Sequence, residues 1–374
     1  MYSVIYDHQA FCLQQYGGVS RYFCEISSRV NQAADFSARI VAPVHFNHHL
    51  SESDAEQTSV YLPMVIPRTG ALYRSVSNFV SPIITRTLKP SVVHQTYFGP
   101  QHATPGALLV LTVFDMIHEL FPDSFPADDR TRRNKRLCTE RANHILCISE
   151  STADDLARLC DVPREKISVT HLGCSDIFRA TPQARDKPAH GRPYLLYVGQ
   201  RFGYKNFSLA LKAYASSKRL RGECDLVVFG GAPFDAAELA LIASLQLDAA
   251  RIVRLVGSDA DLARAYRNAR AFVYPSLYEG FGIPLLEAMS SACAVACSNT
   301  SSIPEVVGNA ASLFDPHDVD SIRQALETTC LDEDVRARLV SAGLKRVCNF
   351  SWDRCAADTL AAYRRILGAA SPAG

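Results

Sequence analysis

Residues 271–295 read AFVYPSLYEGFGIPLLEAMSSACAV. The first four form a short apolar run that predicts a buried strand ending at Pro275. A glycine-bearing loop follows, and Pro284 is expected to open a helix from its first position. Free backbone N–H groups and the positive end of the helix dipole gather at such a junction. The stretch therefore predicts a strand, a loop and a helix that together bind an anion.

Two carboxylates flank this predicted anion site. Glu279 lies in the loop, and Glu287 is expected in the first turn of the helix. A phosphate site does not usually place acids beside the phosphate, so we expect these acids to face hydroxyl groups. Ribose hydroxyls, a diphosphate and hexose hydroxyls together make a nucleotide-sugar. The spacing of the two residues alone leaves an alternative open. Glu279 could be an ordinary acid of a loop, and Glu287 could be an acid that the helix dipole favours, without any role in binding a ligand.

Composition and charge exclude several classes of protein. The chain has 374 residues, which suits two domains, and its net charge of +1 gives no reason to expect nucleic acid as a partner. No apolar run is long enough to span a membrane, and the opening MYSVIYDHQAF does not resemble a signal peptide. The 12 cysteines are scattered without a CxxC pair. We therefore expect a cytoplasmic protein with reduced thiols and no zinc site.

Strand and helix signals alternate along the chain. In the first half, strands are predicted at 4–6, 38–42, 92–94, 108–113, 145–148 and 167–171, helices at 19–30, 72–88 and 149–159 with Ser149 as the N-cap of the last, and an irregular segment at 43–70. In the second half, strands are predicted at 194–198, 226–229, 252–255, 271–274, 294–297 and 312–314, with helices at 207–218, 259–267 and 352–367. Continuous apolar strands alternating with helices indicate parallel sheets covered on both faces.

The predicted fold class is α/β, with two Rossmann-like, doubly wound parallel-sheet domains. We place the N-terminal domain at 1–180 and the C-terminal domain at 194–350, followed by a final helical segment at 351–374. The linker is predicted at 181–193 because 180–193 is rich in proline, glycine and charge. Ligands of such folds bind at the carboxyl ends of the strands, so we expect a ligand in the cleft between the domains.

Other candidate residues also follow predicted strands. Arg201 and Lys205, in VGQRFGYKNF, could neutralise a departing nucleoside diphosphate without a metal; the alternative is a solvated basic loop. Gly17 and Gly18, in QYGGVSRYF, allow close approach of backbone to a ligand, or form an ordinary turn. Their spacing is not GxGxxG, which disfavours a dinucleotide-dependent dehydrogenase.

Asp115 and His118 lie in TVFDMIHELFP, directly after a predicted strand. That position suits residues of a ligand cleft. A single histidine is more often structural, however, so both interpretations of His118 stay open.

The context PSxxEGFGIPLLEAM resembles the retaining glycosyltransferases of family 4, whose signature is E-x7-E on a GT-B fold. The resemblance covers most of the chain and is strongest over 194–315 and at 16–23. It implies that Glu279 contacts the donor hexose near the reacting carbon and that Glu287 holds the ribose. The backbone around the signature would meet the diphosphate and sugar, at Gly280, Phe281, Gly282, Ile283, Pro284 and Leu285.

The family also has the G-x-R-x3-K-N arrangement of Arg201 and Lys205, and a glycine-rich loop like that of Gly17 and Gly18. In many relatives a histidine that touches the hexose directly precedes the aspartate matched by Asp115. Here that position is Phe114, so either His118 takes a similar place or the role is absent. The resemblance further implies that the final helix crosses back to the first domain and that the anomeric configuration is retained.

Acidic pairs and basic clusters suggest further ligands. Three DxD sequences begin at Asp259, Asp318 and Asp332; that number is expected by chance among 38 acids, and we expect no catalytic metal or cofactor. His45, His48 and His49 have no matching metal ligand nearby. One basic cluster consists of Arg130, Arg132, Arg133, Lys135 and Arg136. One interpretation is that this cluster is a solvated face and that the amphipathic helix 72–88 belongs to the core. The other is that they form a surface for anionic lipid or for a lipid-diphosphate acceptor.

The sequence thus predicts a metal-independent hexosyltransferase that uses a nucleotide-sugar, with GDP-mannose as the preferred donor. The acceptor would be a hydroxyl of a glycan or lipid-linked glycan in surface polysaccharide synthesis, with peripheral contact to the cytosolic membrane face. The donor would bind the C-terminal domain and the acceptor the N-terminal one. A nucleotide-sugar epimerase of the same architecture, and a sugar-nucleotide-binding protein without catalysis, are the alternatives.

Overall fold

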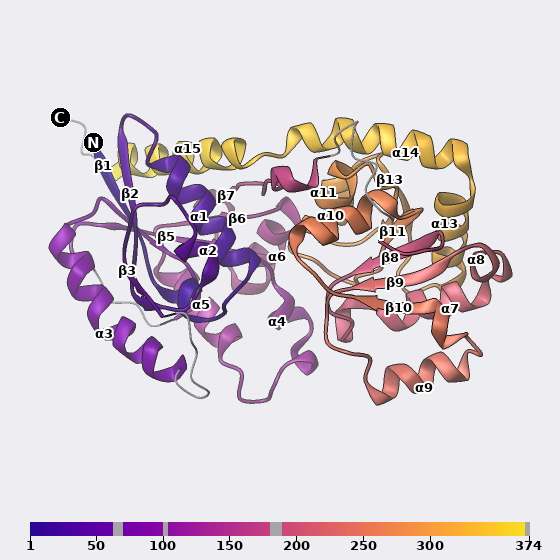
Figure 1. The fold of residues 1–374 in the computed structure, drawn as a ribbon. Helices are drawn as coiled ribbons and strands as arrows, with labels where there is room; N and C mark the ends of the chain where they lie inside the picture. Colours follow the sequence, from indigo (N-terminus) through magenta and orange to yellow (C-terminus); the bar gives the residue numbers. More distant parts are fainter. Residues whose placement is uncertain (63–69, 100–103, 180–188, 371–374) are drawn as a thin grey trace. The chain divides into compact units, whose positions relative to one another are not determined.

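The computed structural model describes residues 1–62, 70–99, 104–179 and 189–370. The chain divides into two compact units, which are described separately (Figure 1). Unit 1 comprises residues 1–172 and 352–374, and unit 2 comprises residues 173–351. Of the linker predicted at 181–193, residues 181–188 lie outside the described part.

Unit 1 is built on a seven-stranded parallel sheet in the order β3-β2-β1-β4-β5-β6-β7. Its strands are β1 (Tyr2–Tyr6), β2 (Phe36–His45), β3 (Gln57–Tyr61), β4 (Val92–Gln95), β5 (Leu108–Val113), β6 (His144–Cys147) and β7 (Ile167–Val169). Its helices are α1 (Gly18–Val30), α2 (His48–Ser51), α3 (Gly70–Leu88), α4 (Ile117–Leu120), α5 (Thr131–Arg141), α6 (Glu150–Cys160) and α15 (Trp352–Ala370). As predicted, Ser149 caps α6 by accepting from the Thr152 N–H at 3.0 Å.

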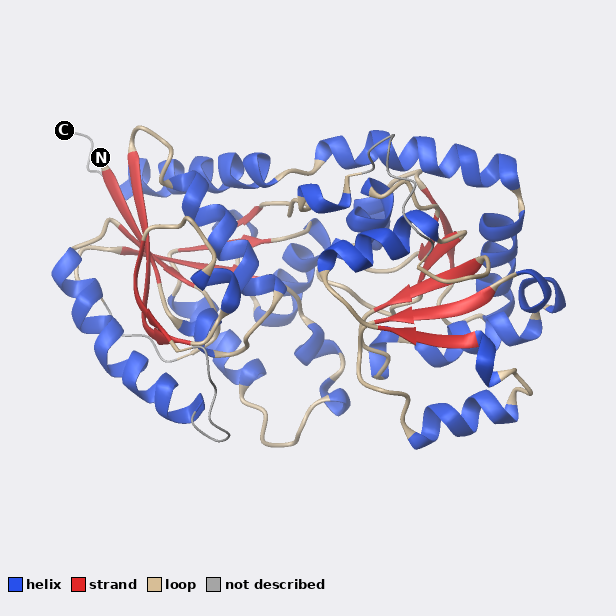
Figure 2. Ribbon diagram, in the orientation of Figure 1, coloured by secondary structure: helices blue, strands red, loops and turns tan. Residues whose placement is uncertain are grey.

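Unit 2 is built on a six-stranded parallel sheet in the order β10-β9-β8-β11-β12-β13 (Figure 2). Its strands are β8 (Tyr194–Val198), β9 (Asp225–Phe229), β10 (Ile252–Leu255), β11 (Ala271–Tyr274), β12 (Val295–Ser298) and β13 (Ala311–Phe314). Its helices are α7 (Phe207–Ser216), α8 (Lys218–Glu223), α9 (Ala236–Ser244), α10 (Asp259–Asn268), α11 (Ile283–Ser290), α12 (Ile303–Val307), α13 (Val319–Leu331) and α14 (Glu333–Arg346). The α/β fold class with two parallel sheets is confirmed.

The irregular segment predicted at 43–70 is wrong over most of its described part. The strand β2 continues to His45, and α2 and β3 follow. The polar residues that suggested a loop are used locally: the Asn47 side chain caps α2 by accepting from the Leu50 N–H at 3.0 Å. β3 pairs with β2 at the end of the strand order, and an edge strand keeps its polar residues half exposed.

The last helix, α15, is anchored to the sheet of unit 1 by a buried polar chain. The Tyr363 hydroxyl lies 2.6 Å from His94 Nδ1, and His94 Nε2 lies 2.8 Å from the Thr112 hydroxyl. At the surface, Arg364 donates to Asp35 at 2.8 Å. These contacts span 269 residues of sequence between His94 and Tyr363, so α15 completes unit 1.

Because His94 is buried in this polar chain, we expect unit 1 to become less stable as the pH falls. Burial lowers the pKa of His94 to about 3, well below the value of about 6.5 expected in the unfolded chain. Because the folded-state pKa is depressed, the stabilisation is fully present above about pH 6.5 and is lost as the pH falls toward 3. The free energy of unfolding of unit 1 should decline from pH 6.5 to pH 5. Fluorescence of Trp352, the only tryptophan in the chain and part of α15, can follow this decline during urea unfolding.

The variant His94→Gln provides the comparison for this measurement. It should be less stable at pH 7, because it cannot restore both hydrogen bonds, and should show a shallower decline with pH. An equally steep decline in His94→Gln would assign the acid sensitivity to other groups.

Candidate active site

The loop after β11 carries Glu279 on backbone that is firmly held. The Glu279 N–H donates to Ser301 Oγ at 2.9 Å. The Ser302 hydroxyl donates to the carbonyl oxygens of Glu279 and Phe281, at 2.8 and 3.1 Å. The Glu279 residue is only 7% exposed. Its carboxylate thus has a fixed place at the carboxyl end of a central strand, where parallel sheets usually bind ligands.

A helix N-terminus follows Glu279, as predicted. Gly282 precedes α11 with φ of 101°, and a Cβ there would lie 2.9 Å from Leu285 Cδ1, so both backbone and space favour glycine. The helix begins at Ile283, which makes Pro284 its second residue; the expected first position is wrong. Gly282 supplies no capping side chain, Pro284 has no N–H, and the Leu285 N–H donates to the Gly282 carbonyl at 2.9 Å. The positive end of the helix dipole, rather than a row of free N–H groups, therefore favours an anion here.

Glu287 is the fifth residue of α11, so its predicted place in the first turn is wrong. The cause is the start of the helix at Ile283, one residue before Pro284. Glu287 is buried, and the Tyr266 hydroxyl of α10 donates to its carboxylate at 3.2 Å. Burial raises the pKa of Tyr266, and the nearby Glu287 raises it further. The role of Glu287 at a ribose stays a prediction.

Lys205 and Glu279 meet in unit 2 although 74 residues separate them in sequence. Lys205 Nζ donates to Glu279 Oε1 at 2.7 Å. The two loops are also joined through their backbones, because the Leu277 N–H donates to the Tyr204 carbonyl at 2.8 Å. The arrangement places a cation and a carboxylate side by side, next to the helix terminus of α11.

Arg201 has a different partner. Its Nε and Nη2 donate to the two carboxylate oxygens of Glu238, at 2.6 and 3.0 Å, and Nη2 also donates to the Ala232 carbonyl at 2.8 Å. Nη1 is buried and has no hydrogen-bond partner among the described residues. Glu238 was not predicted. The spacing from Asp235 to Glu238 is typical of a capping box, which these residues form, but that signal indicates only the start of α9.

Unit 1 contains a cavity of about 330 Å³ that brings several predicted residues together. Asp115 and His118 line it, as do Gln14 and Val19, which lie on either side of Gly17 and Gly18. The rest of the lining is Ala10, Leu13, Tyr97, Phe98, Phe114 and Thr131. Gly17 precedes α1 in an extended conformation that any residue can adopt, and a Cβ there would meet only the end of the exposed Gln14 side chain, so the structure does not require glycine at this position.

His118 is held in this cavity by an aromatic ring and an acid. Its ring stacks on Phe125 with centroids 3.9 Å apart, and Nε2 lies 3.5 Å from Asp129 Oδ2. Burial lowers the pKa of His118, while Asp115 and Asp129 act in the opposite direction. Phe114, at the position where many relatives have histidine, lines the same cavity. Whether His118 assumes that histidine's role stays a prediction.

Lys135 differs from the solvated or lipid-facing residue that the basic cluster suggested. It is fully buried in unit 1, where Nζ donates to Glu119 Oε2 at 2.7 Å and to the Asp115 carbonyl at 2.8 Å. It thereby fixes the backbone that carries Asp115. One signal was present in the sequence, since Cys138 follows Lys135 by three residues and marks the buried face of α5.

The three DxD sequences have structural roles. Asp261 completes the capping box of Ser258 on α10. Asp318 caps α13, and Asp332 caps α14 by accepting from the backbone N–H groups of the first turn. Asp259 and Asp261 both lie in the first turn of α10, where acids are favoured by the helix dipole.

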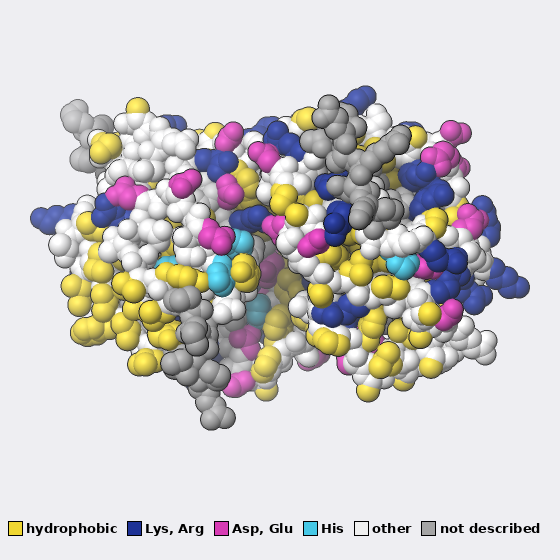
Figure 3. Space-filling view, in the orientation of Figure 1, with side chains coloured by type: hydrophobic (Ala, Val, Ile, Leu, Met, Phe, Trp, Pro, Cys, Tyr) yellow, Lys and Arg dark blue, Asp and Glu magenta, His cyan; other side chains and the backbone are white. Residues whose placement is uncertain are grey.

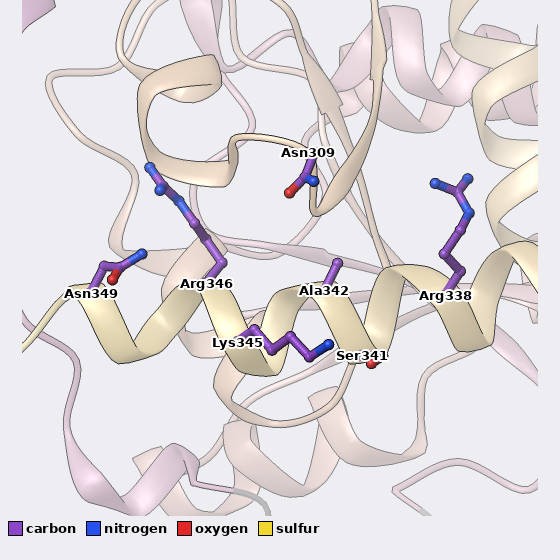
Figure 4. Close-up of a pocket in the computed structure, with 7 residues that line it drawn as sticks. All are labelled: Asn309, Arg338, Ser341, Ala342, Lys345, Arg346 and Asn349. Atoms are coloured by element: carbon purple, nitrogen blue, oxygen red, sulfur yellow. The ribbon is translucent and has the colours of Figure 1, made fainter.

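A second cavity, of about 490 Å³, lies along α14 in unit 2 (Figure 4). It is lined by Asn309, Arg338, Ser341, Ala342, Lys345, Arg346 and Asn349. Arg346 donates to the carbonyls of Val306 and Glu305, at 2.9 and 2.6 Å, and so supports the end of α12. None of the predicted site residues contributes to this lining.

Within 1–62, 70–99, 104–179 and 189–370, no group of three or more His, Cys, Asp or Glu side chains is placed to hold a metal ion. Over the same ranges, no helix combines the length and the apolar character needed to cross a bilayer.

Comparison with known proteins identifies the family to which the chain is similar. Residues 180–346 match the family described as glycosyl transferases group 1, and residues 16–178 match the glycosyltransferase family 4. The chain is 33% identical to O-antigen chain mannosyltransferase B of Escherichia coli over 72% of its own length and 74% of that protein.

Solved structures agree on the fold. Sucrose-phosphate synthase of Thermosynechococcus elongatus is similar with a TM-score of 0.74 and 19% identity, over 98% of this chain and 99% of that one. WaaG, a glycosyltransferase involved in lipopolysaccharide biosynthesis, is similar with a TM-score of 0.69 and 16% identity, over 98% of this chain and 100% of that one. The chain therefore belongs to the glycosyl transferases of group 1 and is a glycosyltransferase with the GT-B fold.

Proposed function

We propose that the protein transfers mannose from GDP-mannose to a hydroxyl of a glycan or lipid-linked glycan in surface polysaccharide synthesis. The O-antigen chain mannosyltransferase to which the chain is 33% identical supports both the sugar and the pathway. We further propose that the anomeric configuration is retained. The residues that match the retaining family, Arg201, Lys205, Glu279 and Glu287, are all present in unit 2.

The observation that carries this proposal is the contact between Lys205 and Glu279 beside the N-terminus of α11. A nucleotide-sugar needs positive charge at its diphosphate and hydrogen-bond acceptors at its hexose. Lys205 supplies the first and Glu279 the second, and without a ligand they neutralise each other. When the donor binds, Lys205 turns to the phosphate and Glu279 accepts from a hexose hydroxyl.

In the proposed reaction, the bond between the anomeric carbon and the phosphate oxygen breaks, and its electron pair leaves with GDP. The acceptor hydroxyl oxygen forms the new bond on the same face of the sugar. Its proton passes to the departing phosphate oxygen. Lys205 and the guanidinium charge of Arg201 stabilise the negative charge that develops on the phosphate, which makes a metal unnecessary.

Glu238 acts in this proposal as a positioning residue. Its carboxylate accepts from Nε and Nη2 of Arg201 and so fixes the plane of the guanidinium, while Nη1 is buried without a hydrogen-bond partner among the described residues. We propose that the acceptor binds the cavity of unit 1 lined by Asp115 and His118. A lipid-linked acceptor would bring the protein into peripheral contact with the cytosolic membrane face.

Donor binding can be tested by thermal shift in the presence of a chelator. Because a ligand that binds only the folded state stabilises it by mass action, GDP-mannose at about 100 times its Kd should add roughly 2.7 kcal/mol. We expect GDP-mannose to raise Tm more than UDP-glucose or free mannose does. Glu287→Gln should reduce the shift if Glu287 holds the ribose. A shift that appears only after Mn²⁺ is added would contradict metal independence, and a larger shift with UDP-glucose would contradict the proposed donor.

A further inference from the structure

The helix α3 exposes a continuous apolar stripe. Leu72, Val76, Phe79 and Ile83 recur at helical spacing along one side, and they are 60%, 38%, 73% and 53% exposed. Figure 3 shows hydrophobic side chains gathered over this helix. The stripe extends over about 16 Å of the helix. An exposed apolar surface of this kind marks a site of interaction.

The opposite side of α3 is polar and buried. Ser77 and Ser81 are 0% and 3% exposed, and Thr85 is 5% exposed. The Ser77 hydroxyl donates to the Val44 carbonyl of β2 at 3.0 Å. A helix that covers a sheet in water normally buries its apolar side and exposes its polar side. In α3 this polarity is reversed, so the core-helix interpretation of the sequence is wrong for these apolar residues.

The charged residues of α3 itself all have one sign. The chain contains 38 acidic residues, yet none occurs between Glu56 and Asp115. The helix and the residue after it carry Arg74, Arg86 and Lys89, all exposed. Arg86 follows Ile83 by three residues and therefore lies on the same side as the stripe. The helix thus combines apolar side chains with basic ones, and the sequence from 57 to 114 contributes no acid.

We infer that α3 lies in the plane of an anionic membrane surface, with the stripe among the acyl chains and the basic residues at the lipid phosphates. A helix with an apolar face and cationic flanks is suited to this position. A second copy of the chain is less suitable, because its own α3 would bring cations to cations. The cluster at Arg130–Arg136 is also less suitable, because Lys135 is buried and Arg136 donates to Glu140 at 3.3 Å.

This surface is independent of the chemistry in unit 2. The inference rests on the proposed function in one respect: the role of the surface would be to hold the enzyme at a lipid-linked acceptor. Binding to vesicles can therefore be measured without donor or acceptor. If the protein does not bind vesicles, the proposed transfer reaction is not contradicted. If the protein does not transfer mannose, the proposed membrane surface is not contradicted.

The test is co-sedimentation of the full chain with vesicles of phosphatidylethanolamine and phosphatidylglycerol. Wild-type protein should sediment with them, and less so at high salt or with phosphatidylcholine alone. Phe79→Ser with Ile83→Ser should weaken partitioning by about tenfold or more, because two apolar side chains no longer enter the bilayer. Arg86→Gln with Lys89→Gln should remove most of the dependence on salt.

The matched control is Leu239→Ser with Leu344→Ser, which removes two exposed apolar side chains from unit 2 and should sediment like the wild type. Fluorescence of Trp352 checks that unit 1 of each variant is folded. The inference is overturned if the wild type does not sediment with anionic vesicles, or if the α3 variant sediments equally well. It is also overturned if the wild type is a dimer that the α3 variant dissociates and neither binds lipid.

Discussion

Lys205→Ala should lower kcat for mannosyl transfer by about two orders of magnitude, because it removes the cation that stabilises charge on the departing phosphate. The site is suited to this role, since Lys205 Nζ is held 2.7 Å from Glu279 Oε1 beside the N-terminus of α11. The effect should fall on kcat more than on KM, because negative charge on the phosphate grows in the transition state. Release of GDP from GDP-mannose in the presence of an acceptor provides the measurement.

Two variants make this result specific. Lys205→Arg keeps the charge and should recover part of the rate. Lys212→Ala removes an exposed lysine from α7 in the same unit and should leave kcat unchanged. Turnover of Lys205→Ala close to that of the wild type would refute the role of Lys205. If Lys205→Ala raised KM and left kcat unchanged, Lys205 would bind the donor equally well in the ground state and the transition state and would not stabilise the leaving group.

Lys135→Met should destabilise unit 1 by about 3 kcal/mol or more. Lys135 is fully buried, and the Glu119 side chain to which it donates is only 6% exposed. Removal of the cation leaves that carboxylate buried without its partner charge, and this cost exceeds the gain from a well-packed methionine. Urea unfolding followed by Trp352 fluorescence measures unit 1 specifically, because the only tryptophan lies in α15.

The control variants separate burial of charge from loss of packing. Lys135→Met combined with Glu119→Gln should be more stable than Lys135→Met alone, because no unpaired charge remains. Arg136→Met, on the next residue of α5, removes an exposed partner of Glu140 and should change stability by about 0.5 kcal/mol or less. If Lys135→Met and Arg136→Met were equally stable, the buried ion pair would not support unit 1.

Central strands such as β5, β8 and β11 were well predicted because they are largely buried and therefore read as continuous apolar runs. Residues 108–113, 194–198, 252–255 and 271–274 were predicted with the observed bounds. The edge strand β3 was missed because its residues QTSVY are polar and half exposed. The capped start of α6 was predicted from Ser149, whose side chain forms a local hydrogen bond that sequence alone can indicate.

Contacts between distant residues could not be predicted from pattern alone. Nothing in the sequence joins Lys205 to Glu279 or Arg201 to Glu238, since those contacts depend on how the loops after β8, β9 and β11 meet. The periodicity of α3 predicted the helix correctly. It did not show which side faces the sheet, because an apolar stripe fits a core or a membrane equally well.

The central claim is transfer with retention from a nucleotide-sugar, and NMR spectroscopy of the wild-type reaction tests it most directly. The protein is incubated with GDP-mannose, with and without a short mannose oligosaccharide as acceptor, and the anomeric signals are followed over time. We expect an α-linked product that forms in step with GDP and only slow hydrolysis when the acceptor is absent. Conversion of the donor to another nucleotide-sugar without acceptor, or a β-linked product, would contradict the account.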